Sequence, residues 1–423
     1  MIVLRATIYH APGSGLKSYV DGGLAIADGR IAACGDYEAV LRAHPHATVR
    51  DLRGGYLLPG LIDTHVHYPQ IRILGSFGYE LLDWLKRFTI PEEERLADRG
   101  YARLIAREFV QGLLSHGTTT ALAFGSHFST AMVELFETAQ ASGLRLFSGL
   151  VLSDRNLSAK LHVSPELAYE QSQELIRRFH GRGRMRYAVM PRFALSASEP
   201  MLEVCQTLVK EYPAVGFTTH VNENPHEVES VKRIFPWARD YLEVYERFDL
   251  VQRRSVLAHN VLGTDAEIER ISQHGATVAH CPASNAFLGS GIFPLARHRR
   301  LGARVSLGTD VGGGTGFGIL KEGLQAYLMQ RVAAEPLSLT PGELLHLATR
   351  AGAEALEMGN EIGDFEAGKA ADFIYLRPPE ESALAAVLKP AEDPERILGA
   401  IFTLAGAESV REVHIGGDLV FGS

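Results

Sequence analysis

The sequence predicts an α/β fold, a (β/α)8 barrel (TIM barrel) with a small β-sandwich domain built from both chain ends. The chain has 423 residues, more than one ordinary domain but a length that suits a barrel of about 250 to 400 residues with an appendage. Apolar strand-like runs alternate with helical segments in the middle of the chain, and short strands with glycine turns occupy both ends. We expect residues 1–55 plus 364–423 to form the small domain and residues 56–363 to form a metal-dependent catalytic barrel.

Short β runs punctuated by glycine turns define the small domain. At the N-terminus they are IVLRATIYH and GGLAIADGRIAACGD, and at the C-terminus KAADFIYLR and VREVHIGGDLVFGS. Helical segments separate the second pair from the middle of the chain. We therefore expect the chain to leave this domain near Gly55 and to return to it near Gly363.

Eight apolar runs, each followed by a segment with helical spacing, predict the barrel. They are LLPGLIDTH, TTALAFGS, LRLFSGLVL, RMRYAVMPRF, VGFTTHV, SVLAHN, ATVAHCP and ARVSLGTD. The same alternation also fits a doubly wound open sheet. A His, Arg or Asp ends at least five of the runs, and the C-terminal ends of strands are where barrels carry their chemistry, so the barrel is favoured.

The composition indicates a globular protein and argues against two other classes. Hydrophobic residues make up 46% and charged residues 22% of the chain, which excludes a disordered or collagenous protein. A net charge of −8 and the lack of a long basic patch argue against nucleic-acid binding. Cys34, Cys205 and Cys281 suggest no disulfide framework. With no long apolar segment and no signal-like N-terminus, we expect a soluble cytoplasmic protein without membrane contacts.

Polar residues at the strand ends indicate a metal site. His65 and His67 stand two residues apart on one strand, so their side chains point to the same face. His220, His259 and Asp310 end three later strands. Any one of these histidines alone is more often a structural residue, but together they suit Zn²⁺, or Fe²⁺, with room for a water.

Glu223 follows His220 by three residues and is the candidate general acid and base. A carboxylate beside a metal-bound water can take its proton and pass it to a substrate. The alternative is a carboxylate that only stabilises the start of the following helix. Asp310 would bind metal and also accept a hydrogen bond from the water.

Three further polar residues are candidates for substrate contacts. Arg192 ends the fourth run, where its guanidinium can donate to a carbonyl oxygen or ring nitrogen or can form a structural salt bridge. Gln70 carries a donor and an acceptor, which suits the mixed edge of an amide-containing heterocycle, although it could be a plain loop residue. His280 ends the seventh run and could contact the attacked group or support the site from behind.

Two further segments are interpreted by their composition. The run GTDVGGGTGFG after the last strand lacks the lysine and spacing of nucleotide-binding loops, so we expect its glycines to let the backbone pass close to a substrate. The amphipathic segment YELLDWLKRFTIPEEERL, around Trp84, could be core packing, a lid or a subunit contact.

The motifs PGLIDTHVH, the isolated His220 and His259, Asp310 in GTD and the closing EAGKAADFIYL together resemble the amidohydrolase superfamily over nearly the whole chain. Within it, HVHYPQ, HGTTTALAFGS, PRFALS, THVNENPHEVE, HCPASNAFLGSG and GTDVGGGTGFG are similar to the guanine deaminase family. The resemblance implies a barrel with a flanking β-sandwich, one catalytic zinc, a homodimer, and hydrolytic deamination of guanine to xanthine and ammonia in purine catabolism. No lysine ends a middle strand, which disfavours the binuclear branch of the superfamily.

The resemblance also assigns roles residue by residue. The implied metal set is His65, His67, His220, His259 and Asp310; the implied catalytic residues are Glu223, Asp310 and His259; the implied substrate contacts are Gln70, Arg192, Phe193 and His280. Two rival hypotheses remain. The first is a related aminohydrolase acting on 8-oxoguanine, a pterin or another amino-substituted ring, and the second is a catalytically dead barrel that serves as a scaffold.

Overall fold

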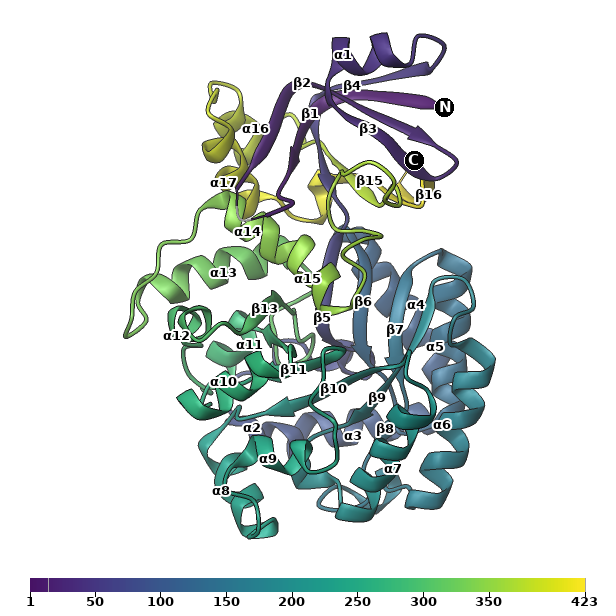
Figure 1. Cartoon of the computed structure of the whole chain (residues 1–423), viewed down its shortest axis with the longest axis vertical. Coiled ribbons are helices and arrows are strands. Elements are labelled where there is room, and N and C mark those ends of the chain that lie inside the picture. The colour runs from purple at the N-terminus through teal and green to yellow at the C-terminus, as the bar shows by residue number, and fades with distance from the viewer. Residues whose placement is uncertain (14, 423) are drawn as a thin grey trace.

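The computed structural model describes residues 1–13 and 15–422 and shows two sheets, one above the other in Figure 1. Both chain ends contribute to the smaller sheet, as predicted. Within the described residues it is a single mixed sheet of seven strands in the order β16-β15-β14-β4-β1-β2-β3. Its strands are β1 (Ile2–His10), β2 (Lys17–Ala27), β3 (Arg30–Asp36), β4 (Thr48–Pro59), β14 (Phe373–Leu376), β15 (Val410–Ile415) and β16 (Asp418–Gly422).

The larger sheet is the predicted parallel barrel. Its strand order is β13-β12-β11-β10-β9-β7-β6-β5, and the two-residue strand β8 (Val151–Leu152) pairs with β9. The strands in chain order are β5 (Leu61–His67), β6 (Thr118–Phe124), β7 (Arg145–Gly149), β9 (Met185–Pro191), β10 (Gly216–Val221), β11 (Ser255–His259), β12 (Thr277–His280) and β13 (Arg304–Leu307). Side-chain and backbone hydrogen bonds join the last strand region to the first: the Thr64 hydroxyl donates to the Leu307 carbonyl at 2.8 Å, and the Asp310 amide to the His65 carbonyl at 2.8 Å.

Helices surround the barrel strands (Figure 1). Around the barrel they are α4 (Arg99–Ser115), α5 (Ser129–Ser142), α6 (Pro165–Phe179), α7 (Glu199–Glu211), α8 (Pro225–Ile234), α9 (Tyr241–Glu246), α10 (Asp265–Gln273), α11 (Pro282–Phe287), α12 (Leu295–Arg300), α13 (Ile319–Arg331), α14 (Pro341–Ala348) and α15 (Arg350–Ala355). Beside the smaller sheet lie α1 (Tyr37–Ala43), α16 (Ala383–Leu388) and α17 (Pro394–Leu404). Serine caps at Ser164 and Ser198 begin α6 and α7, each accepting a backbone hydrogen bond from the first turn.

The first predicted barrel strand differs from the observed one. The run 57–65 was expected to be continuous, but Gly60 divides it: residues before it belong to β4 in the smaller sheet, and β5 begins at Leu61. A Cβ at residue 60 would overlap the Thr119 side chain, and the Gly60 amide donates to the Asp372 carbonyl at 3.0 Å. The chain therefore passes from one sheet to the other through a position that only glycine fits.

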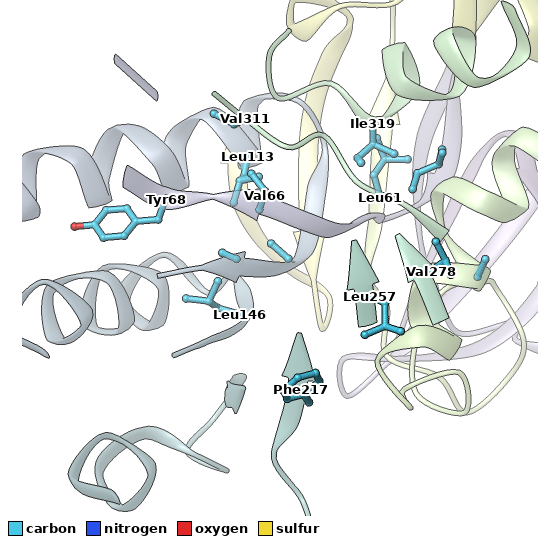
Figure 2. Packing of buried hydrophobic residues seen from close by; sticks show 14 of the residues in the cluster. Leu61, Val66, Tyr68, Leu113, Leu146, Phe217, Leu257, Val278, Val311 and Ile319 are labelled. Carbon is cyan, nitrogen blue, oxygen red and sulfur yellow. The ribbon is translucent and has the colours of Figure 1, made fainter. Parts of the chain in front are cut away.

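An extended apolar cluster combines side chains from the barrel strands and the surrounding helices. Figure 2 shows Leu61 and Val66 of β5 together with Phe217, Leu257 and Val278 from strands across the barrel. All five are at most 2% exposed. Burial of each such side chain contributes roughly 1.5–3 kcal/mol, so the core fixes the strand ends that carry the polar residues.

Candidate active site

Five side chains from four strand ends meet at the mouth of the barrel. His65 and His67 come from β5, His220 from β10, His259 from β11, and Asp310 lies three residues after β13. The Asp310 carboxylate is 3.4 Å from His65 Nε2 and 3.2 Å from His67 Nε2, and His67 Nε2 is 3.2 Å from His220 Nε2. Ligand atoms of His65, His220 and His259, and those of His65, His67 and Asp310, lie within 4.8 Å of one another.

The histidine rings are held so that the Nε2 atoms face one another. His220 Nδ1 hydrogen-bonds the Arg192 carbonyl at 2.5 Å, and His259 Nδ1 hydrogen-bonds Asn285 Oδ1 at 2.9 Å. Such contacts to the second ring nitrogen select the tautomer whose Nε2 lone pair is available to a metal. His65 Nε2 and His259 Nε2 are buried without a hydrogen-bond partner among the described residues. Imidazole and carboxylate donors converging in this way fit a divalent metal ion.

The backbone that carries two of these residues has a left-handed conformation. His259 has φ of 70° and Asp310 φ of 49°, values that side-chain-bearing residues rarely adopt. Each costs on the order of 1–3 kcal/mol, and such costs are concentrated at functional sites. Asp63 stabilises the backbone next to Asp310, since its carboxylate accepts hydrogen bonds from the Thr309 hydroxyl at 2.5 Å and from the Thr309 amide at 3.1 Å.

Glu223 lies beside the histidine cluster. Its Oε2 is 3.5 Å from His259 Nε2, and the Ser290 hydroxyl is 3.5 Å from its Oε1. Burial, and then the charge of Asp310, raises the pKa of Glu223 well above its usual range. The Glu227 carboxylate accepts the Glu223 amide at 3.1 Å and so fixes the backbone at this position.

Four of the five metal-ligand candidates, all except His65, line a small cavity together with Glu223. Its wall combines polar and apolar side chains. The lining residues are His67, Gln70, Leu81, Trp84, Leu85, Arg192, Phe193, His220, Glu223, His259, Leu288 and Asp310. A cavity with a few convergent polar groups in an apolar wall is typical of a small-molecule site.

The segment around Trp84 forms the apolar wall. It consists of α2 (Leu81–Trp84), a π-helical turn η2 (Leu85–Thr89) and α3 (Ile90–Glu94). Leu81, Trp84 and Leu85 pack with Phe193 and Leu288 in a separate apolar cluster. Because three of its residues line the cavity, the segment does more than pack against the core: it covers one face of the site.

A model described as "Amidohydrolase family" matches residues 56–420. The chain belongs to this family. The chain is 54% identical to a probable guanine deaminase of Deinococcus radiodurans, over 100% of this chain and 99% of the relative. It is 37% identical to the guanine deaminase of Escherichia coli, over 96% of this chain and 93% of the relative. Within the family, the chain groups with the guanine deaminases.

Solved structures agree with this grouping. The structure entitled "E. coli Guanine Deaminase" matches with a TM-score of 0.96 and 35% identity over the whole of both chains. A guanine deaminase from Bradyrhizobium japonicum matches with a TM-score of 0.94 and 34% identity, over 100% of this chain and 99% of that one. Amidohydrolases depend on metal, and the histidine and aspartate cluster of this member is the candidate metal site. Among the described helices, none has the length and apolar character needed to span a membrane.

A residue that the sequence analysis did not identify, Glu93, contacts two polar residues of the amidohydrolase cavity without lining the cavity itself. Gln70 and Arg192, two predicted substrate contacts, line the cavity, and both are bonded to Glu93 of α3. Arg192 Nη1 is 2.7 and 2.8 Å from the two Glu93 oxygens, and Gln70 Nε2 donates to Glu93 Oε1 at 3.0 Å. His127 Nδ1 lies 3.6 Å from Glu93 Oε2. Glu93 stands in the run EEE, which usually indicates a solvent-exposed helix face.

His280 is placed differently from the other predicted substrate contacts. It ends β12, next to β11, but it is not among the residues that line the cavity. Its ring stacks on Phe293 with centroids 4.5 Å apart, and burial lowers its pKa to about 3. This position favours the alternative in which His280 supports the site from behind, without direct substrate contact.

Proposed function

We propose that this chain catalyses the hydrolytic deamination of guanine to xanthine and ammonia, with one divalent metal ion, Zn²⁺, per subunit. The observation that carries the proposal is that Glu223 and three of the histidines line the same cavity as the polar residues Gln70 and Arg192. The names of the relatives at 54% and 37% identity support the same substrate. Assembly as a homodimer, a cytoplasmic location and a part in purine catabolism belong to the same proposal.

The metal ligands we propose are His65, His67, His220, His259 and Asp310. A bound divalent ion in such a site lowers the pKa of a coordinated water toward about 7. Asp310 also lies close enough to the imidazole Nε2 atoms to accept a hydrogen bond from the water and to aim it. His259 is turned into the site by Asn285, beside Glu223.

Glu223 moves the protons in the proposed reaction. It takes one proton from the attacking water and gives it to purine N3 as the water oxygen bonds to C2. The second water proton goes to the C2 amino group, the C2–N bond breaks, and ammonia leaves. The C2 oxygen then forms the carbonyl of xanthine, and N3 keeps its proton, so the atoms of guanine and water equal those of xanthine and ammonia.

The cavity walls would orient the purine. Leu81, Trp84, Leu85 and Phe193 offer apolar surface to the ring faces, while Arg192 donates to acceptors on its edge. Gln70 offers an amide oxygen to a ring N–H. A related aminohydrolase acting on 8-oxoguanine, a pterin or a halogenated triazine would use the same metal set, so the pocket edge decides between substrates. A dead scaffold would require gaps in the donor set, and the described chain has all five donors and Glu223.

An ammonia-release screen tests the proposal directly. Zinc-loaded protein is incubated separately with guanine, 8-oxoguanine, isoguanine, cytosine and pterins, and Glu223→Gln serves as the inactive control. Guanine should give the highest kcat/KM, with xanthine as the product. Fast ammonia release from another ring, without release from guanine, would show that guanine is not the substrate. No ammonia release from any ring would favour the scaffold hypothesis.

A further inference from the structure

Three consecutive glutamates of α3 have three different surroundings. Glu92 accepts hydrogen bonds from Tyr101 and Arg95, and Glu94 binds Lys160 at 2.9 Å near the surface. Glu92 and Glu93 are both buried, but of the three only Glu93, whose side chain is 3% exposed, contacts the cavity residues Gln70 and Arg192. A buried carboxylate is costly unless donors surround it, and the donors here are two residues of the substrate cavity.

The contacts of Glu93 fix the orientation of the Gln70 amide. An ionised carboxylate has no proton to donate, so the group of Gln70 that faces it must be the NH₂ group. The 3.0 Å bond from Gln70 Nε2 to Glu93 Oε1 therefore leaves the amide oxygen, Oε1, for a ligand. Without Glu93, the amide could rotate and present a donor in place of an acceptor.

The same carboxylate holds the Arg192 side chain. Both Glu93 oxygens contact one nitrogen, Nη1, so Nε and Nη2 remain available to donate. The backbone of Arg192 is also fixed, since its carbonyl accepts from the amide and Nδ1 of His220. Arg192 is thus bound to a candidate metal ligand on one side and to Glu93 on the other.

Burial acts to raise the pKa of Glu93, but the positive charge of Arg192 and its hydrogen bonds to the carboxylate outweigh burial, and the pKa of Glu93 is lowered. Glu93 is therefore a carboxylate at neutral pH and acts only as an acceptor. His127 Nδ1 lies 3.6 Å from Glu93 Oε2, and burial lowers the pKa of this histidine to about 4. Arg192 is then the charged partner of Glu93.

We propose that Glu93 is the positioning residue that sets the hydrogen-bonding polarity of the cavity edge, and thereby its specificity for a purine with a C6 carbonyl and an N1–H. This inference rests on the proposed function. Through Glu93, Gln70 is fixed as an acceptor for a ring N–H and Arg192 as a donor to a carbonyl oxygen or ring nitrogen. A ring that lacks this donor and acceptor pair forms no hydrogen bonds with Gln70 and Arg192 at this edge and therefore gains little binding affinity from their fixed orientation.

Two purines that lack the C2 amino group separate this role from a structural one. Hypoxanthine carries the C6 carbonyl and N1–H, whereas purine carries neither, and the absence of the C2 amino group prevents the proposed reaction. Each is tested as a competitive inhibitor of guanine deamination by wild type, Glu93→Gln and Glu93→Asp. Glu94→Gln is the matched control, because it makes the same chemical change one residue away, at a carboxylate that binds Lys160 near the surface and contacts neither Gln70 nor Arg192 among its described bonds.

In Glu93→Gln, the Ki of hypoxanthine should rise at least tenfold, while the Ki of purine should change less than threefold. The KM of guanine should rise with the Ki of hypoxanthine, and Glu94→Gln should change none of these values. Glu93→Asp should shift the hypoxanthine Ki in the same direction by a smaller factor, and it carries the test if Glu93→Gln does not fold. Equal shifts for both inhibitors, or no shift in either Glu93 variant, would overturn the inference. Wild-type protein without activity on guanine would instead refute the proposed function.

Discussion

Gly312 stands where the loop after β13 passes Gln70, and replacing it with alanine tests the placement of that side chain. Its φ is 112°, and an added Cβ would meet Gln70 Oε1 and lie 2.5 Å from Gln70 Cβ. Gly316, in the same loop, has φ of 144° and nothing within 4 Å of an added Cβ. Gly312→Ala therefore combines backbone strain with displacement of Gln70, whereas Gly316→Ala introduces the strain alone.

The magnitude follows from the contact that is lost. One hydrogen bond contributes about 0.5–1.5 kcal/mol, and about 1.4 kcal/mol corresponds to a tenfold change in rate. We expect Gly312→Ala to lower kcat/KM for guanine roughly 2- to 12-fold, mainly through KM. Strain is present in both the free and the bound enzyme, so it should lower Tm in both variants without changing kcat/KM in Gly316→Ala.

The assay is steady-state ammonia release, with bound zinc and Tm measured on the same preparations. Both variants should bind metal like the wild type, because neither glycine carries a ligand atom. Equal kcat/KM values for Gly312→Ala and Gly316→Ala would show that Gln70 does not contact the substrate. The assignment of Gln70 to the cavity edge would then have to be abandoned.

Three other predictions concern the metal site and a buried acid. Glu223→Gln should keep wild-type zinc content, measured by mass spectrometry, yet lose at least about 10²-fold in kcat, because general acid–base catalysis contributes about 10²–10⁴-fold; a wild-type rate would exclude Glu223 as the proton carrier. Chelation at neutral pH should abolish ammonia release and lower Tm, since an ion that binds only the folded chain stabilises it, and added Zn²⁺ should restore both; activity that survives complete metal removal would contradict the ligand set. Burial raises the pKa of Glu322 from 4.5 to about 8. Between these two pH values the folded chain holds a proton that the unfolded chain releases. The contribution of the protonated Glu322 to the free energy of unfolding is therefore fully present below about pH 4.5 and is lost as the pH rises to about 8. Glu322→Gln has a side chain of the same shape that does not ionise, so its Tm should fall less than the Tm of the wild type between pH 5 and pH 8. Equal falls in Tm would show that Glu322 is not buried as a neutral acid.

The sequence predicted the metal-ligand candidates because they stand at strand ends. His65 and His67 share a strand face through the two-residue period, and His220 and His259 each terminate an apolar run. Strand ends of one barrel meet at one mouth, so local patterns were enough to bring distant residues together. The structure places these side chains within reach of one another and of Asp310.

Glu93 could not be identified in the same way. Its neighbours Glu92 and Glu94 are also glutamates, and the sequence does not show which of the three carboxylates the short helix directs toward Gln70 and Arg192. The division of the first run at Gly60 depended similarly on a tertiary contact, the Thr119 side chain. His280 ends β12 as expected, but the stacking of its ring on Phe293 is a tertiary contact that periodicity does not determine.

The hydrogen bonds between the first and last barrel strands have a consequence for the order of folding. His65 and Asp310 belong to opposite ends of the barrel sequence, and the backbone bond between them forms only when the last strand has docked. During synthesis, the ligand set therefore stays incomplete until the chain beyond Asp310 has left the ribosome. Metal binding would then indicate that the barrel has closed. In metal-free protein, amide hydrogen exchange should accelerate first at β5 and at the loop after β13.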